Sequence, residues 1–108
     1  MYPTEYNIVM NTLVSTDAFA DWLSGLRNMA GKARILQRLD AAQQGNFGDC
    51  APVGDGISEM RVHAGPGYRI YFTRRGEVVY LLLLGGDKSS QKRDISRAKA
   101  LLKTLPKE

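Results

Sequence analysis

Cysteine and histidine are almost absent from this chain of 108 residues, which contains one residue of each. A single cysteine, Cys50, cannot form an intramolecular disulfide, and no metal-ligand spacing surrounds it. The chain also has no charged segment followed by an apolar one at its start, and no apolar run long enough to span a bilayer. We therefore expect a soluble, cytoplasmic protein without a metal, a cofactor or a membrane contact.

Length and charge set the next limits. At 108 residues and 12.0 kDa, the chain is expected to fold as one domain, residues 1–108, around a single core. The formal net charge of +4 favours an anionic partner, although proteins that bind nothing charged often have a similar balance. The C-terminal segment is basic, with these residues after position 87: Lys88, Lys92, Arg93, Arg97, Lys99, Lys103 and Lys107, against Asp94 and Glu108.

Hydrophobic periodicity predicts the first half of the fold. Residues Tyr6 to Val14 favour a strand, and residues 15–17 offer an N-cap for a helix that ends near Asn28. A second helix is expected from about Lys32 to the breaker region at residues 45–49. The apolar stripes of these helices are Phe19, Trp22, Leu23 and Leu26 in the first, and Ile35, Leu36, Leu39 and Ala42 in the second.

The second half predicts three consecutive strands and a helix. Turns at residues 65–67 and 74–77 separate the strands, and the third, from Val78 to Leu84, is apolar throughout and therefore central. Helical spacing restarts near Ser89 or Ser90 and stops at Pro106. The predicted class is α+β, with an N-terminal strand, a helical hairpin packed on a mainly antiparallel four-stranded sheet, and a C-terminal helix.

Strand alternation separates charged from apolar side chains. Met60, Val62, Ile70 and Phe72 can be buried on one face, whereas Glu59, Arg61, His63, Arg69 and Tyr71 fall on the opposite rows. A sheet face that carries guanidinium groups in a small basic protein is a candidate phosphate site. The alternative is that Arg61 and Arg69 pair with Glu59 or Asp87 as surface salt bridges, each contributing about 0–1 kcal/mol.

An ordered set of short motifs extends from about Phe19 to Leu102. Its members are Trp22-Leu23, Ala33-Arg34-Ile35, Arg38-Leu39, Gly45-Asn46, Gly48-Asp49, Gly56 to Arg61, Gly65 to Phe72, Leu83 to Lys88, Gln91 and Asp94. The set resembles the RelE/ParE toxin superfamily, and within it the HigB-like branch of addiction-module killer proteins. The resemblance implies a RelE-like fold, a toxin of a type II toxin–antitoxin system, and a cognate antitoxin that is often a helix-turn-helix DNA-binding protein.

In this superfamily the activity is most often cleavage of messenger RNA on the ribosome, and in the ParE branch it is inhibition of DNA gyrase. Metal-free RNA cleavage attacks the phosphate with the neighbouring 2′-hydroxyl, so a site must take up a proton and stabilise negative charge. Arg69 resembles the family arginine that contacts the scissile phosphate, and Lys88 stands where RelE-type toxins place a second cation. Arg61 lies on the same predicted face as Arg69.

Proton transfer needs another group, because arginine does not lose its proton in proteins. The candidates are His63, Glu59, Tyr71, Asp87, Lys88 and Asp94. Histidine titrates in the right range, although a lone histidine before a Gly-Pro-Gly turn is more often a solvated residue. In RelE, a tyrosine in the C-terminal segment takes part in proton transfer. No tyrosine follows Tyr80 in this chain, and Asp94 stands at roughly the position of that tyrosine. The C-terminal histidine of HigB relatives is also unmatched. Tyr71 either stacks on a base or packs on the sheet.

Two further segments have weaker signals. Gly85-Gly86-Asp87-Lys88 lacks the spacing of a phosphate-binding P-loop and predicts a tight turn that presents Lys88. The basic residues Lys92, Arg93, Arg97 and Lys99 predict either an RNA-binding face or an ordinary solvated face of the last helix. The leading hypothesis is a ribosome-dependent mRNA endoribonuclease. The alternatives are a non-catalytic ParE-like gyrase inhibitor, suggested by the missing tyrosine, and a degenerate toxin that only binds its antitoxin.

Overall fold

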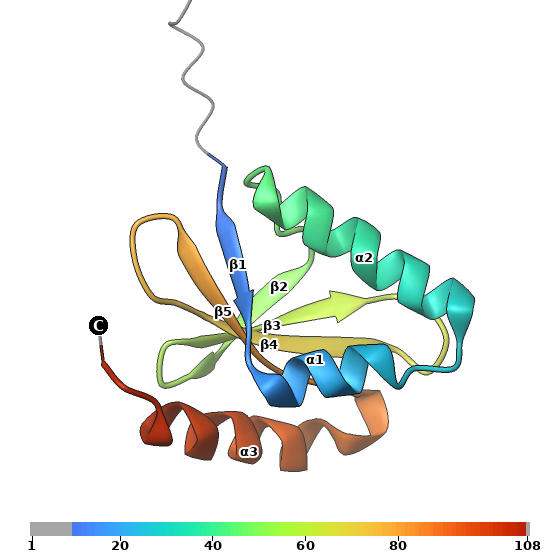
Figure 1. Cartoon of the computed structure of the whole chain (residues 1–108). Helices are drawn as coiled ribbons and strands as arrows, with labels where there is room; N and C mark the ends of the chain where they lie inside the picture. Colours follow the sequence, from blue (N-terminus) through green and yellow to red (C-terminus); the bar gives the residue numbers. More distant parts are fainter. Residues whose placement is uncertain (1–9, 108) are drawn as a thin grey trace, which may run out of the picture.

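The computed structural model describes residues 10–107 (Figure 1). The chain begins with one strand and two helices, continues with four strands in succession, and ends with a short 3-10 turn and a final helix. The elements are β1 (Thr12–Ser15), α1 (Asp17–Ser24), α2 (Met29–Gln43), β2 (Cys50–Gly54), β3 (Ile57–Val62), β4 (Tyr68–Arg74), β5 (Val79–Asp87), the short 3-10 helix η1 (Lys88–Ser90) and α3 (Gln91–Thr104). The α+β class predicted from the sequence is confirmed.

One mixed sheet with the strand order β1-β5-β4-β3-β2 organises the chain. β1 pairs with β5 in parallel, and the other neighbours are antiparallel. The sheet has five strands rather than the four predicted, because residues 50–54 pair with β3 despite containing a proline and a glycine. Proline is tolerated there because β2 is an edge strand. Of the first predicted strand, residues 12–14 belong to β1, residues 10 and 11 do not, and residues 6–9 lie outside the described residues.

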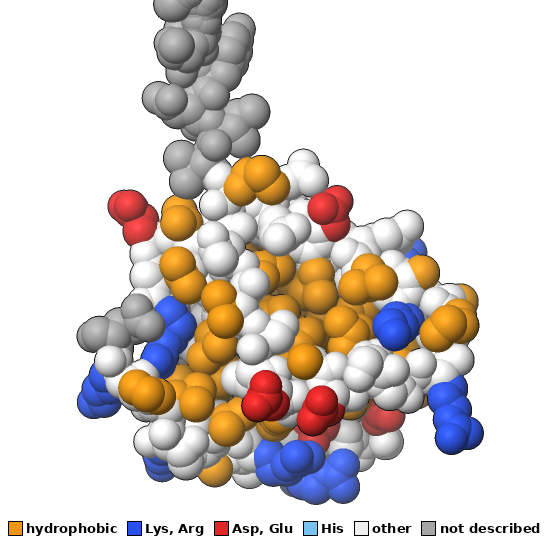
Figure 2. Space-filling model, viewed as in Figure 1, with side chains coloured by type: hydrophobic (Ala, Val, Ile, Leu, Met, Phe, Trp, Pro, Cys, Tyr) orange, Lys and Arg blue, Asp and Glu red, His pale blue; other side chains and the backbone are white. Residues whose placement is uncertain are grey.

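Two helices cover one face of the sheet. The Thr16 hydroxyl accepts a hydrogen bond from the Phe19 N–H and caps α1, and the Asn28 side chain accepts from the Gly31 N–H and caps α2. α1 packs against β5 and α2 against β3, so the two helices cover different strands (Figure 1). Between them and β1, hydrophobic side chains remain visible at the surface (Figure 2).

The core on this face contains the apolar rows that alternation predicted. Its buried members are Phe19, Ile35, Ala42, Met60, Val62, Tyr68, Ile70, Phe72 and Leu82, with Trp22, Leu23, Leu26 and Leu39 partly buried around them. Leu36 is an exception, because it is 48% exposed and not part of the stripe as predicted. None of the helices in residues 10–107 combines the length and apolarity that crossing a bilayer would require.

α3 covers part of the opposite face, which carries a second buried cluster of Ile57, Tyr71, Leu83, Leu84 and Ala98. A bulge in β5 lets two consecutive leucines join this cluster, since Tyr71 pairs with Leu84 while Phe72 pairs with Leu82. With helices on both faces, β5 is buried on both sides, which explains its continuous apolar sequence.

Residues Gly85 and Gly86 belong to β5, so the predicted tight turn at this point is wrong. Each glycine makes room for a side chain from a helix. A Cβ at Gly85 would lie 2.1 Å from the Trp22 ring, and a Cβ at Gly86 would lie 1.9 Å from a carboxylate oxygen of Asp94. The pair therefore allows α1 and α3 to approach β5 closely.

Candidate active site

Four of the predicted site residues line one cavity at the end of the β3–β4 hairpin. The cavity has a volume of about 550 Å³ and is bounded by Arg61, Val62, His63, Ala64, Gly65, Pro66, Gly67, Tyr68, Arg69 and Lys88. We refer to it as the basic cavity. Strand register explains the gathering, because Arg61 pairs directly with Arg69, and Tyr68 pairs with the residue before Lys88.

A buried carboxylate lies behind the two arginines. Glu59 is 1% exposed, and its Oε1 accepts hydrogen bonds from Arg69 Nη1 at 2.9 Å and from Arg61 Nε at 3.3 Å. Like charges directly opposite each other on a sheet destabilise it, and this shared carboxylate offsets that repulsion. The arginines therefore pair with Glu59, as one sequence-based alternative stated, but through a buried carboxylate instead of a surface salt bridge.

The other oxygen of Glu59 connects the sheet to α3. Glu59 Oε2 accepts from Gln91 Nε2 at 2.7 Å and from the Tyr71 hydroxyl at 3.2 Å. Gln91 is the first residue of α3 and follows η1, which begins at Lys88. One carboxylate thus fixes both arginines and the segment that carries the lysine.

Tyr71 is completely buried, with 0% of its surface exposed. Its ring packs in the cluster under α3, which leaves no face for a nucleotide base, so the base-stacking alternative does not fit the structure. Burial, followed by the negative charge of Glu59, raises the pKa of the Tyr71 hydroxyl well above its usual range. The phenol therefore stays neutral and donates to Glu59, and it is no proton acceptor near neutral pH.

His63 and Arg61 share a second carboxylate, that of Asp49. His63 Nε2 lies 2.7 Å from Asp49 Oδ2, and Arg61 Nη1 donates to Asp49 Oδ1 at 3.1 Å. The hydrogen bond with His63 is the main cause that lowers the pKa of Asp49, and the positive charge of Arg61 contributes. Sequence reasoning did not place Asp49 in the site, because the segment before β3 was interpreted as a loop. Recognising β2 would have found it, since β2 pairing brings Asp49 beside Arg61.

Lys88 is the exposed cation of the basic cavity. It opens η1, where the preceding Asp87 caps the turn through the Ser89 N–H at 2.9 Å. Hydrogen bonds from Ser89 are the main reason that the pKa of Asp87 is lowered. Within residues 10–107, Lys88 forms no ion pair, so its charge is not cancelled by a neighbouring carboxylate.

Asp94 and the basic residues of α3 lie outside the basic cavity. Asp94 is buried against Gly86 and accepts a hydrogen bond from the Ser90 hydroxyl, and it forms ion pairs with Arg93 at 3.7 Å and Arg97 at 3.6 Å. In Figure 2, basic side chains lie along the α3 edge of the molecule, below acidic side chains over α1. The structure does not bring Lys92, Arg93, Arg97 and Lys99 to the lining of the cavity.

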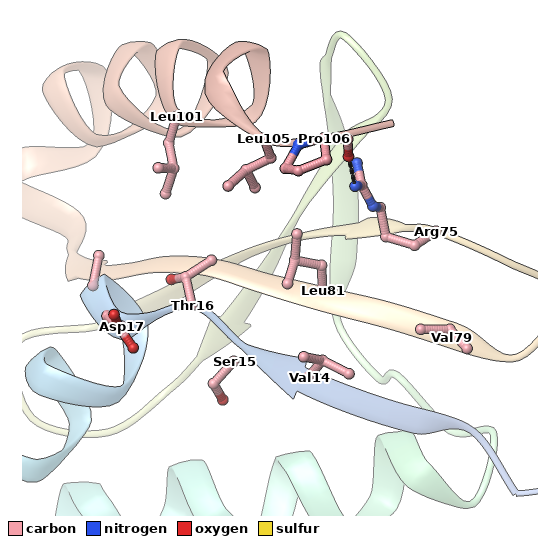
Figure 3. Close-up of a pocket in the computed structure, with 11 residues that line it drawn as sticks. Val14, Ser15, Thr16, Asp17, Arg75, Val79, Leu81, Leu101, Leu105 and Pro106 are labelled. Atoms are coloured by element: carbon pink, nitrogen blue, oxygen red, sulfur yellow. Dashed lines mark hydrogen bonds between the residues drawn. The ribbon is translucent and has the colours of Figure 1, made fainter. Parts of the chain in front are cut away.

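A second cavity, of about 490 Å³, lies between β1, β5 and the end of α3 (Figure 3). Most of its lining is apolar, and we refer to it as the apolar cavity. Arg75 stands at its rim and donates to the Pro106 carbonyl. The lining residues are Val14, Ser15, Thr16, Asp17, Ala18, Arg75, Val79, Leu81, Leu101, Leu105 and Pro106.

A comparison with known protein families identifies the family of this chain. The family model described as "Phage derived protein Gp49-like (DUF891)" matches residues 21–103, a range that includes every residue that lines the basic cavity. The chain belongs to this Gp49-like family. It is a family of RelE/HigB-like toxins, which is consistent with a toxin of a toxin–antitoxin system and implies a cognate antitoxin.

A relative in Haemophilus influenzae supports this membership. It is 47% identical over 91 residues, which cover 84% of this chain and 92% of the relative, and it carries the name "Uncharacterized protein". No solved structure matches the Gp49-like chain. The family model and this relative together establish the family of the chain.

Proposed function

We propose that this Gp49-like protein is a HigB-like toxin that acts in the cytoplasm and cleaves messenger RNA on the ribosome without a metal. The observation that carries the proposal is the basic cavity, where Arg61, Arg69, Lys88 and His63 meet. In the reaction the ribose 2′-oxygen bonds to phosphorus while the P–O5′ bond breaks. The site must then stabilise extra negative charge on the phosphate oxygens.

The cations of the cavity suit this task despite their carboxylate partners. The basic cavity has three positive charges, on Arg61, Arg69 and Lys88. Glu59 and Asp49 carry two negative charges, so a net charge of +1 remains when His63 is counted as neutral. A guanidinium has five N–H donors, and Glu59 occupies one of those on Arg69. The carboxylate therefore orients the arginines and leaves donors for a phosphate, while Lys88 supplies an unpaired charge at the mouth.

The proposed partners are a helix-turn-helix antitoxin, the ribosome and its mRNA. The basic residues of α3, Lys92, Arg93, Arg97 and Lys99, would contact ribosomal RNA through its phosphates. Such contacts weaken as salt rises, because counterions compete for the same charges.

Mapping of transcript 5′ ends after induction tests the proposal. Wild type should produce new ends within codons, and Lys88→Ala and Arg69→Ala should lose them and relieve growth arrest. Arg34→Ala and Lys103→Ala are matched controls, because each removes one exposed cation outside the basic cavity. Lys88→Ala removes an exposed side chain and should fold normally, so persistent cleavage by Lys88→Ala together with Arg69→Ala would reject this site.

A ParE-like gyrase inhibitor is the second candidate. The pairing of both arginines with buried Glu59 favours it, since part of their charge is already compensated. The absence of a tyrosine after Tyr80 points the same way. Intact transcripts together with induced DNA damage would support the inhibitor, whereas no growth effect on expression would indicate a degenerate antitoxin-binding module.

A further inference from the structure

The proposed reaction lacks an assigned proton acceptor, and the structure provides a built pair of residues for it. His63 lines the basic cavity at the end of β3, and its Nε2 is engaged by Asp49 at 2.7 Å. Among the described residues, Nδ1 of the same ring makes no hydrogen bond. A ring nitrogen held by a carboxylate leaves the opposite nitrogen to exchange protons, with its tautomer fixed by the partner.

The loop that carries Asp49 is held in place from two sides. The Arg61 N–H donates to the Asp49 carbonyl at 2.9 Å, which ties the loop to β3. From α2, Arg38 donates to the Phe47 carbonyl at 2.8 Å and to the Arg61 carbonyl at 2.5 Å. Gly48 permits this approach, because its φ is +67° and a Cβ would lie 2.7 Å from the Arg38 guanidinium. Asp49 is thus a fixed partner for the imidazole.

We propose that His63 is the general base of the reaction and that Asp49 is its positioning residue. This inference rests on the proposed nuclease function. His63 Nδ1 takes the proton of the 2′-hydroxyl, the 2′-oxygen bonds to phosphorus, the P–O5′ bond breaks, and the leaving 5′-oxygen takes a proton from water. The imidazolium then gives its proton to the hydroxide that this water leaves, which restores the neutral base. The products are a 2′,3′-cyclic phosphate and a 5′-hydroxyl, so protons and electrons balance without a further reactant.

Charge around the imidazole agrees with these roles. Asp49 faces it directly, Arg61 shares the same carboxylate, and Arg69 and Lys88 line the same cavity. The lowered pKa of Asp49 keeps this carboxylate ionised when His63 accepts a proton. The three cations disfavour the imidazolium, so the carboxylate is the group that stabilises it during the reaction.

The test is the single-turnover cleavage rate in a purified translation system with ribosomes stalled on a defined mRNA, measured from about pH 5 to about pH 8. His63→Gln should lower the rate by about 10²–10⁴. Asp49→Asn should lower it by at least about 10-fold and move the acid limb of the profile to lower pH, because loss of a neighbouring carboxylate disfavours the imidazolium. Asp55→Asn is the matched control, since it removes the same charge at the opposite end of β3 and should retain the wild-type rate and profile.

The outcomes separate the two proposals. A wild-type rate in Asp49→Asn, or a reduced rate with an unshifted pH profile, overturns the role of Asp49 while the nuclease function stands. A wild-type rate in folded His63→Gln overturns the base assignment in the same way. Absence of cleavage by the wild-type protein rejects the proposed function, and the base with it. Thermal unfolding of each variant verifies that the exposed substitutions leave the fold intact.

Discussion

The two cavities of this molecule have nearly the same size but are built differently. The basic cavity has a volume of about 550 Å³ and takes its lining from a hairpin turn, two strand ends and Lys88. The apolar cavity, of about 490 Å³, takes its lining from β1, β5 and the last turn of α3 (Figure 3). The first has a buried carboxylate behind its cations, and the second has leucine and valine side chains. The two cavities therefore differ in the chemistry of their linings although their volumes are similar.

The difference shows that charged side chains need bonding partners that hold them in position before they can bind a ligand. Glu59 contributes no surface of its own to the lining of the basic cavity, yet it orients Arg61 and Arg69 and also bonds Gln91. At the apolar cavity, the Thr16 hydroxyl bonds the Leu83 carbonyl and the Phe19 N–H, and Arg75 bonds the Pro106 carbonyl, but no buried carboxylate is among the described residues that line it. Substitutions should therefore have large effects on one side of the molecule and small effects on the other.

Replacement of Glu59 should produce the largest effect. Glu59→Ala removes the carboxylate acceptor of Arg69, the Tyr71 hydroxyl and the Gln91 amide, and one of the two carboxylate partners of Arg61, so it should lower the free energy of unfolding by about 3–5 kcal/mol. Urea unfolding measures it. Glu77→Ala, at an exposed position, is the control and should change stability by less than about 0.5 kcal/mol. Equal stability of the two variants would remove the structural basis of the basic cavity.

Arg69→Ala should have the next largest effect, on catalysis. If Arg69 stabilises charge in the transition state, its loss should lower the cleavage rate by about 10²–10³, as removal of an oxyanion donor does. The substitution also removes the Arg69 partner of the buried Glu59 carboxylate. The rate is therefore compared with that of Glu59→Gln/Arg69→Ala, in which position 59 carries no charge. A normal rate in either folded variant would show that the guanidinium has no catalytic role.

A substitution in the apolar cavity should affect stability slightly and cleavage not at all. Leu101 is partly buried against the cluster under α3, so Leu101→Ala should cost about 1 kcal/mol on unfolding. Exposed Leu36→Ala is the control and should be neutral within about 0.5 kcal/mol. A loss of cleavage in stable Leu101→Ala would contradict the separation of the two cavities.

The smallest expected effect is on the free energy of unfolding at acidic pH. Because the pKa of Asp49 is lowered in the folded protein, this carboxylate stabilises the fold at pH values above the ordinary aspartate pKa of about 3.9. The contribution is lost as the pH falls through the lowered pKa. The stability difference between wild type and Asp49→Asn, measured by urea unfolding, should therefore shrink between about pH 5 and about pH 3. A difference that stays constant over this range would argue against the interaction with His63.

Periodicity predicted the helices, the β3–β4–β5 strands and the separation of charged from apolar rows, because these depend on local spacing. It failed where contacts between distant segments decide. β2 contains Pro52 and Gly54 and resembles a loop until it pairs with β3, so Asp49 was missed. Gly85 and Gly86 suggested a turn because their neighbours Trp22 and Asp94 come from other parts of the chain.

The site was predictable to a similar degree. Spacing along two strands was enough to bring Arg61 and Arg69 together, and the register of β4 with β5 explains why Lys88 joins them. The burial of Tyr71 could not be predicted from alternation, which assigns it to the charged row. That row is partly covered by α3, which packs on Tyr71 and bonds through Gln91 to Glu59, a carboxylate that no short motif identifies as buried.

The parallel pairing of β1 with β5 has a consequence for synthesis of the protein. β1 begins at Thr12, and its partner residues are Val79 to Leu82, so the sheet cannot close until most of the polypeptide has left the ribosomal exit tunnel. Closing so long a loop also carries an entropic cost that only the completed chain can offset. The β1–β5 pairing of this protein therefore forms only late in translation or after it, once residues 79–82 are free to meet β1.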